Sequence, residues 1–186
     1  MRLKLCQFFS LVLVLLSCSC IELYQELEFT KDNAGKFKLK LSVSDVIYSN
    51  FVLGSKLDHY FDRKKGEALF KKSGVFIFNK YTVFNHENKK HLQIEGEISD
   101  MKKAMESKIL GEFLYKFESG QKTVRLVFPK SKASKVDLKG LKLEMKIKVN
   151  GKITKCNAEK QGKKEASWIV NEANFNEKQD VFIQWR

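Results

Sequence analysis

Seven side chains of this sequence belong to the residue types that proteins most often use as nucleophiles or metal ligands. They are four cysteines and three histidines, namely Cys6, Cys18, Cys20, Cys156, His59, His86 and His91. A thiol nucleophile needs a positioned base, and a zinc site needs several ligands at suitable spacing. The sequence shows neither pattern, nor a Gly-rich phosphate loop or a nucleophile elbow. We therefore predict no catalytic residue, no cofactor and no metal site, which leaves covalent modification of a thiol.

Two of the cysteines follow a short apolar leader. Arg2 and Lys4 give it a positive start, residues 5–16 are almost wholly apolar, and residues 17–20 are small. This layout is typical of a secretory signal peptide. The apolar run has about twelve residues, whereas a bilayer-spanning helix needs roughly twenty, so a permanent transmembrane helix is the weaker interpretation.

The end of the leader resembles the lipobox of bacterial lipoproteins, in which the signal is cut before a cysteine and the thiol is then acylated. Leu15 and Ser17 occupy the favoured positions −3 and −1 before Cys18, although Leu16 is larger than usual at −2. Small residues also precede Cys20, but they lack the leucine. We predict lipidation at Cys18, with Cys20 as the alternative. If neither is acylated, an ordinary signal cleavage would release a soluble protein.

The rest of the chain has the composition of one folded domain. Of the whole sequence, 43% is hydrophobic, with fifteen phenylalanines and a single proline. A chain of this length can bury a sizeable core, and no Pro-rich linker divides it. We therefore predict a lipoprotein signal peptide over residues 1–17 and a single envelope domain over residues 18–186.

The chain is basic, but the type of basic residue argues against a nucleic-acid partner. The formal net charge is +13, and loss of the leader with Arg2 and Lys4 lowers it to +11. Nucleic-acid readers usually use the planar fork of arginine to grip phosphates and guanine edges. This sequence has only four arginines, and lysine supplies the remaining positive charge. We expect no binding of DNA or RNA.

Alternating patterns predict a sheet-rich fold. In residues 36–41 and 141–149, charged and apolar side chains alternate, which places them on opposite faces of a strand. Asn150 and Gly151 form the strongest hairpin signal, and the apolar stretch 75–84 is expected in the centre of a sheet. The expected strands cover residues 21–29, 36–41, 75–84, 91–98, 113–118, 122–128, 141–149, 152–157, 166–170 and 180–185.

Two segments have helical rather than strand patterns. Residues 42–72 carry apolar side chains at spacings of three and four, and Ser99 is a candidate cap for a short helix that ends near Ser107. The sequence thus predicts an α+β fold, with mostly antiparallel twisted sheets of about nine to ten strands and two helical regions packed on one side.

The lysines of the alternating strands form two rows that could face a membrane. A strand that begins about three residues after the anchor holds the domain within about 10 Å of the lipid surface, close to the Debye length of about 8 Å. Anionic head groups attract a nearby lysine by roughly 1 kcal/mol. The alternative is an ordinary solvated sheet face. The rows comprise Lys36, Lys38 and Lys40, and Lys142, Lys146 and Lys148.

The order of segments resembles the LppM-type lipoprotein domain of bacterial envelopes. The matching features are a hairpin over 21–36 directly after a cysteine, a helical stretch ending at 69–75, a strand that leads into 98–101, and the strands 152–157 and 168–170. The resemblance implies an envelope-facing α+β domain without an assigned enzymatic activity. It also implies acylation at Cys20, in conflict with the lipobox pattern.

These observations predict a lipid-anchored protein of the cell membrane or outer membrane that faces the periplasm or the cell exterior. We expect its domain to be a non-enzymatic binding or scaffolding module for another envelope protein or a host surface molecule. The alternative is a carrier of a lipid or small apolar ligand in a cavity between sheet and helices. A third hypothesis, a hydrolase, would need two carboxylates that converge in a cleft.

Overall fold

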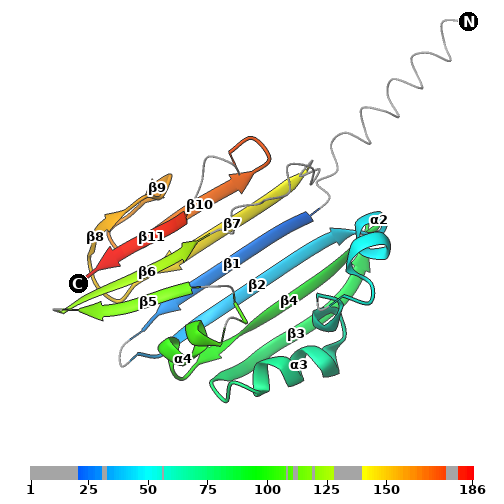
Figure 1. Cartoon of the computed structure of the whole chain (residues 1–186), viewed down its shortest axis with the longest axis horizontal. Coiled ribbons are helices and arrows are strands. Elements are labelled where there is room, and N and C mark those ends of the chain that lie inside the picture. The colour runs from blue at the N-terminus through cyan, green and yellow to red at the C-terminus, as the bar shows by residue number, and fades with distance from the viewer. Residues whose placement is uncertain are drawn as a thin grey trace, which may run out of the picture.

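The computed structural model describes residues 21–30, 33–55, 57–107, 109–110, 113–118, 120–127, 140–174 and 180–186. The predicted signal peptide and both candidate lipidation sites, Cys18 and Cys20, lie outside these residues. Within them, two β-sheets and a few short helices form the fold (Figure 1).

Sheet A has seven strands, in the order β3-β4-β2-β1-β7-β10-β9. β1 lies between β2, with which it pairs antiparallel, and β7, with which it pairs parallel. Sheet A is therefore mixed, and the prediction of a mostly antiparallel sheet omits this parallel pair. Its strands are β1 (Ile21–Phe29), β2 (Gly35–Ser44), β3 (Phe76–His86), β4 (Lys89–Ile98), β7 (Leu141–Lys148), β9 (Lys160–Gln161) and β10 (Glu165–Asn171).

Sheet B has four strands, in the order β5-β6-β11-β8, and all of its pairs are antiparallel. The expected strand count of nine to ten is slightly low, because the two-residue strand β9 carries no sequence signal of its own. The strands of sheet B are β5 (Phe113–Glu118), β6 (Gln121–Val127), β8 (Ile153–Cys156) and β11 (Asp180–Trp185).

The helical segments are short, and the three α-helices of the described residues begin at side-chain caps. The cap of α4 is Asp100 and not Ser99, because the Asp100 carboxylate accepts the backbone N–H of Lys103 at 3.1 Å. Ser44 and Asp62 cap α2 and α3 in the same way. The segments are α2 (Asp45–Ile47), the π-helical turn η1 (Tyr48–Val52), the 3-10 turn η2 (Asp58–Phe61), α3 (Arg63–Lys71) and α4 (Met101–Glu106).

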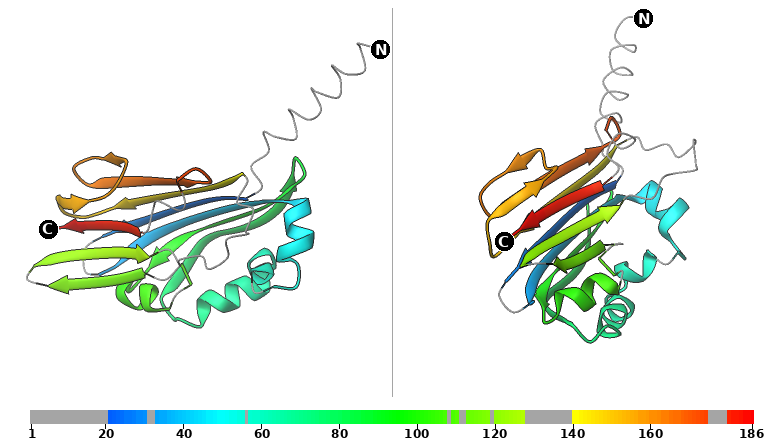
Figure 2. Two further views of the ribbon diagram at one scale, coloured as in Figure 1. Left: turned by 45° about the horizontal axis from the view of Figure 1, so that its top comes forward. Right: turned by 60° about the vertical axis from the view of Figure 1, so that its left-hand side comes forward.

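Sheet A has a charged outer face and an apolar inner face, as the alternating patterns predict. In β2, Phe37 and Val43 are buried, whereas Lys36 and Lys40 on the opposite face are exposed. Sheet B and the helices lie on the same side of sheet A, over its inner face (Figure 2). Phe70 of α3, for example, stacks on Phe37 with ring centroids 5.9 Å apart.

Both tryptophans belong to the core, as their place in strand patterns predicts. Trp168 of β10 and Trp185 of β11 are fully buried. Each indole N–H donates to an asparagine side chain, Trp168 to Asn157 at 2.8 Å and Trp185 to Asn150 at 3.2 Å. A buried indole needs such a partner for its polar atom.

The prediction of a central strand at residues 75–84 is wrong. β3 is the edge strand of sheet A, with Ile77 57% exposed on the outer side. Its apolar character on the inner side comes from packing beneath α3, where Phe78 and Phe70 lie 5.3 Å apart. A bulge between Phe78 and Lys80 interrupts its pairing with β4, a common protection for edge strands.

The turn at Asn150 and Gly151 does not join a hairpin, because β7 belongs to sheet A and β8 to sheet B. Its backbone pairs instead with the end of β11, where Lys152 and Arg186 exchange N–H···O bonds of 2.8 and 3.1 Å. A Cβ atom on Gly151 would lie 1.7 Å from the Arg186 carbonyl oxygen. The glycine is therefore required for the close approach of the two sheets.

Candidate functional site

The anchor region predicted from the sequence leads directly into the centre of sheet A. β1 begins at Ile21, one residue after Cys20 and three after Cys18. Ile21 pairs with Val43 of β2 and with Leu141 of β7. Either cysteine would therefore attach the acyl chains to the end of the sheet where β1 starts.

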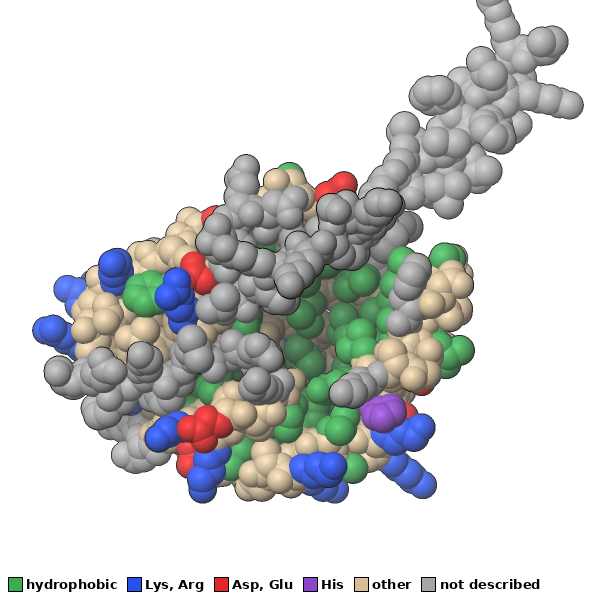
Figure 3. Space-filling model, in the orientation of Figure 1, with side chains coloured by type: hydrophobic (Ala, Val, Ile, Leu, Met, Phe, Trp, Pro, Cys, Tyr) green, Lys and Arg blue, Asp and Glu red, His purple; other side chains and the backbone are tan. Residues whose placement is uncertain are grey.

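Part of the inner face of sheet A, mainly along the first residues of β1 and β7, is incompletely covered. Five aliphatic side chains of three neighbouring strands are only half-buried, and we call them the inner apolar patch. They are Ile21 and Leu23 of β1, Leu39 of β2, and Leu141 and Leu143 of β7. Figure 3 looks onto this side of the molecule and shows a hollow whose floor consists of hydrophobic side chains.

The other end of the inner face is closed by tight packing. Leu27 and Ile147 occupy the same face as the patch but are fully buried. Beyond them, Phe29 of β1 contacts Trp185 of sheet B with ring centroids 4.8 Å apart. The inner face is therefore filled at this end of the strands. Toward Ile21, the inner-face side chains of β1 and β7 are half-buried, whereas Leu41 and Val43 of β2 are buried.

A buried polar side chain borders the inner apolar patch. Gln25 of β1 is buried, and its amide donates to the Leu110 carbonyl oxygen at 2.9 Å. This bond ties the segment after α4 to the sheet. Gln25 was not among the predicted site residues, although it is the one polar residue at the inward positions of residues 21–29 and could have been recognised by that position.

The two lysine rows lie on the outer face, but glutamates of neighbouring strands alternate with them. Lys38 pairs with Glu95 at 2.7 Å, Lys148 with Glu26 at 2.5 Å and Lys146 with Glu165 at 3.0 Å.

The remaining lysines of the rows also have acidic or aromatic neighbours across the strands. Lys36 stands between Glu28 and Glu97, and Lys142 stands opposite Glu22. The Lys40 ammonium lies 5.7 Å from the Tyr24 ring. The outer face is thus a lattice of alternating charges, which weakens its attraction to anionic head groups.

The centre of this lattice shifts the pKa values of its members. Burial alone would raise the pKa of Glu26, but hydrogen bonds from Lys148 and Tyr24 outweigh it and lower that pKa. The hydrogen bond between Lys148 and Glu26 also raises the pKa of Lys148. Burial and the bond to Glu26 raise the pKa of the Tyr24 hydroxyl well above its usual value.

The change Glu26→Gln is expected to lower the free energy of unfolding at pH 7 by about 1 kcal/mol, since the pair is partly exposed to solvent. A carboxylate with a lowered folded-state pKa stabilises the fold above its unfolded pKa of about 4.3, and this contribution is lost as pH falls through the folded value. Urea unfolding at pH 7 and pH 3 should show that the difference in the free energy of unfolding between the variant and the parent chain is smaller at pH 3. The matched change at the exposed Glu97 should show little at either pH; an equal loss there would contradict the role of the Glu26 pair.

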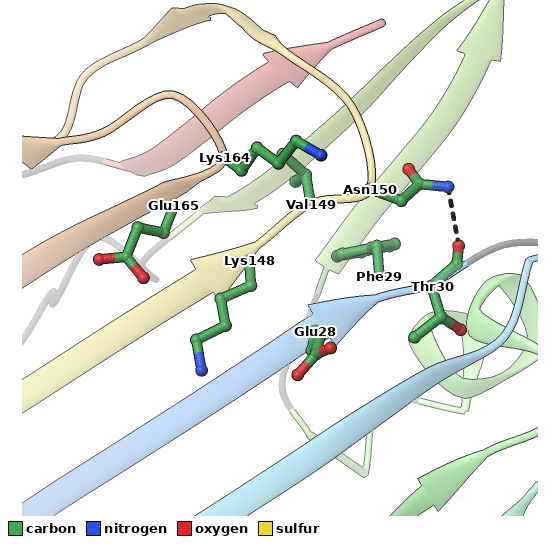
Figure 4. A pocket seen from close by; sticks show the side chains of 8 residues that line it. All are labelled: Glu28, Phe29, Thr30, Lys148, Val149, Asn150, Lys164 and Glu165. Carbon is green, nitrogen blue, oxygen red and sulfur yellow. Dashed lines mark hydrogen bonds between the residues drawn. The ribbon is translucent and has the colours of Figure 1, made fainter.

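A second hollow of about 410 Å³ lies where β1 and β7 end (Figure 4). Its lining includes Glu28 and Glu165, with Lys148 on the strand between them. β1 and β10 lie on either side of β7 and are therefore about 10 Å apart. The Glu28 and Glu165 carboxylates thus lie on either side of the Lys148 ammonium and do not converge. Asn150 donates to the Thr30 carbonyl oxygen at 2.9 Å at the rim. This hollow does not supply the acid pair that the hydrolase hypothesis needs.

Two of the histidines, His86 and His91, and the domain cysteine Cys156 make contacts within the fold. His86 and His91 approach to a ring separation of 6.3 Å, and His91 stacks on Phe84 and bonds the Ser42 hydroxyl at 2.8 Å. Cys156 is half-buried, and its thiol donates to Gln161 at 2.9 Å. No group of three potential metal ligands occurs among the described residues.

The described residues also include no helix that is long and apolar enough to cross a membrane.

Comparison with known proteins identifies the fold. No protein family profile matches the sequence, and no curated protein matches it. Among solved structures, the folded domain of LppM from Mycobacterium tuberculosis is similar with a TM-score of 0.61 over 90% of each chain, at 8% sequence identity. At this identity the likeness concerns the fold alone. The LppM-like fold predicted from the order of segments is therefore confirmed.

Proposed function

We propose that this chain is a lipid-anchored envelope protein whose domain binds a lipid or another apolar ligand in the hollow above the inner apolar patch. The observation that carries this proposal is the half-buried state of five aliphatic side chains on the inner face of three neighbouring strands. It favours the carrier hypothesis among the non-enzymatic functions expected from the sequence.

The energetics support a ligand at this place. Each Å² of apolar surface removed from water contributes about 25 cal/mol, so a ligand that covers the exposed part of these side chains would be stabilised. The patch spans β2, β1 and β7, which gives it a width of about 10 Å. This size suits an alkyl chain or a flat apolar ring.

The anchor supports a membrane source for this ligand. Ile21 is both a patch residue and the first residue of β1, so the hollow lies beside the point where the acylated segment would enter the domain. A ligand drawn from the bilayer would need to travel only a short distance to reach it.

Scaffolding of an envelope or host protein is the second candidate. It is favoured by the edge strand β3, where Ile77 is 57% and Phe84 38% exposed. An extended partner segment could add to such an edge. The bulge between Phe78 and Lys80 makes the β3 edge less suitable for pairing with a partner strand than a regular edge would be.

The ligand is tested on the full chain purified from bacterial membranes. Organic extraction of the folded protein followed by mass spectrometry is expected to release an apolar compound in a fixed ratio to protein. The same extraction of a purified soluble protein of similar size serves as the control. A chain that carries no such compound, and that does not quench or shift a fluorescent fatty acid, would rule the proposal out.

The anchor is tested by the mass of the mature N-terminus. Cys18→Ser is expected to abolish acylation and to release the protein from the membrane fraction, whereas Cys20→Ser should leave both unchanged. The reverse pattern would assign the acyl chains to Cys20, as the LppM resemblance implies. Cys156→Ser is the control. An unmodified thiol at both N-terminal positions would contradict lipid anchoring.

A further inference from the structure

We propose that the domain stands on its bilayer end-on, with an apolar tip formed by Val46, Leu53 and Leu57 inserted among the lipids. This inference rests on the lipid anchor proposed above and adds the surface that meets the membrane. It places the hollow against the bilayer and turns the charged outer face of sheet A away from it.

The tip consists of three exposed large hydrophobic side chains on α2 and on the connection between η1 and η2. Val46 of α2 is 69% exposed, and Leu53 and Leu57, which flank the turn between η1 and η2, are 62% and 39% exposed. Three exposed aliphatic side chains within twelve residues have no role in the core. At a bilayer surface their burial would be favourable.

Hydrogen bonds of the local structure hold the turn that carries the exposed side chains of Leu53 and Leu57. The Asp58 carboxylate accepts from the Tyr48 hydroxyl and from the Gly54 N–H, the latter at 3.1 Å. Gly54 has φ of +76°, a conformation that glycine adopts without strain, and the Ser55 N–H bonds the Val52 carbonyl oxygen at 2.9 Å. The turn is thereby fixed with its leucines outward.

The tip lies at the same end of sheet A as the predicted anchor. Val43, two residues before α2, pairs with Ile21, and the Asp45 N–H bonds the Asn88 carbonyl oxygen at 2.9 Å. The views in Figure 2 agree that α2 projects from the end where β1 starts. Because Ile21 follows Cys20 directly, an acyl anchor would hold this end within about 10 Å of the lipid surface.

The neighbours of the tip suit the head-group region. The Lys90 ammonium lies 3.9 Å from the centre of the Tyr48 ring and donates to its hydroxyl at 2.7 Å. A tyrosine with a lysine beside it offers an apolar body with a polar end, the combination found at membrane interfaces. Together with the proposed lipid anchor at the same end of the sheet, these contacts favour a lipid surface over a protein partner for the tip.

Tryptophan reporters in the full, acylated chain can measure the orientation on vesicles. The variants Leu53→Trp, Ile77→Trp and Lys40→Trp place the reporter at the tip, at the opposite end of the sheet, and on the outer face, respectively. The native Trp168 and Trp185 are buried and supply a constant background. On vesicles of phosphatidylcholine with brominated acyl chains, we expect strong quenching for Leu53→Trp and none for the other two.

The outcomes decide between distinct geometries. Quenching of Lys40→Trp without Leu53→Trp would show that the charged face lies on the membrane, and it would overturn the proposal. Equal quenching at all three sites, or none at any site, would also overturn it. A supporting measurement is Leu53→Glu in a chain with both N-terminal cysteines changed to serine, which should weaken vesicle binding about tenfold, whereas Ile77→Glu should not.

The orientation and the proposed function can fail separately. If the chain carries an apolar compound but Leu53→Trp shows no quenching, the ligand site is supported and the membrane-inserted tip is contradicted. If Leu53→Trp is quenched but the chain carries no apolar compound, the membrane-inserted tip is supported and the ligand site is contradicted.

Discussion

Replacement of Leu143 by tryptophan is expected to weaken binding of an alkyl-chain ligand about thirtyfold while the domain stays folded. Leu143 lies on β7 opposite Leu23 of β1, and both are half-buried in the inner apolar patch. The larger ring would occupy the space of two or three methylene groups of the ligand. At roughly 0.8 kcal/mol per methylene, this displaces about 2 kcal/mol of binding free energy.

The binding change is measured by titration of the full chain with a fluorescent fatty acid. Leu143→Ala, which enlarges the hollow, is expected to retain binding, so the series tests occupied volume and not the identity of the residue. Ile77→Trp is the matched control, since it adds the same ring to the exposed edge of the opposite face. The near-ultraviolet circular dichroism of the variants should stay close to that of the parent chain. Undiminished binding by a folded Leu143→Trp would place the ligand elsewhere.

The change Trp185→Ala is expected to lower the free energy of unfolding by about 3–5 kcal/mol, a large fraction of the total stability of a domain this size. Trp185 is fully buried, contacts the Phe29 ring and donates to Asn150. Asn150 in turn donates to the Thr30 carbonyl oxygen, so the tryptophan joins the end of β11 to the end of β1. Its removal leaves a cavity between the two sheets and an amide oxygen without its donor.

Urea unfolding followed by far-ultraviolet circular dichroism measures this loss. Ile77→Ala is the control, because Ile77 is 57% exposed on the edge strand and surface changes usually stay within about 0.5 kcal/mol. Similar midpoints for the two variants would show that sheet B is not held to sheet A through Trp185.

Local patterns in the sequence predict the strands well and their neighbours less well. The alternation of lysine and apolar residues in 141–149 identifies β7 and its two faces correctly. It contains no information on the strand that pairs with β7, and the parallel neighbour is β1, about 120 residues earlier. The edge position of β3 was missed for a related reason, because packing under α3 makes an edge strand as apolar as a central one.

The same limit applies to the candidate surfaces. Each lysine of the two rows is correctly placed on the outer face, but the glutamates that alternate with them come from β1, β4 and β10, and only the register of the sheet brings them together. The inner apolar patch likewise combines residues of three strands. Its half-buried state depends on how far sheet B and the helices extend over sheet A, which no local pattern encodes.

The central place of β1 has a consequence for biogenesis. If the chain is exported as proposed, its N-terminal end emerges first, and β2, β4 and β3 can assemble on one side of β1 as they follow. β7 pairs with the other side of β1, so the backbone donors and acceptors on that side remain unpaired until the segment that contains β7 has also emerged. Such long-range pairing is slow and exposes an open edge to aggregation. We therefore expect maturation of this protein to depend on a chaperone that shields the nascent half-sheet beside the translocation channel.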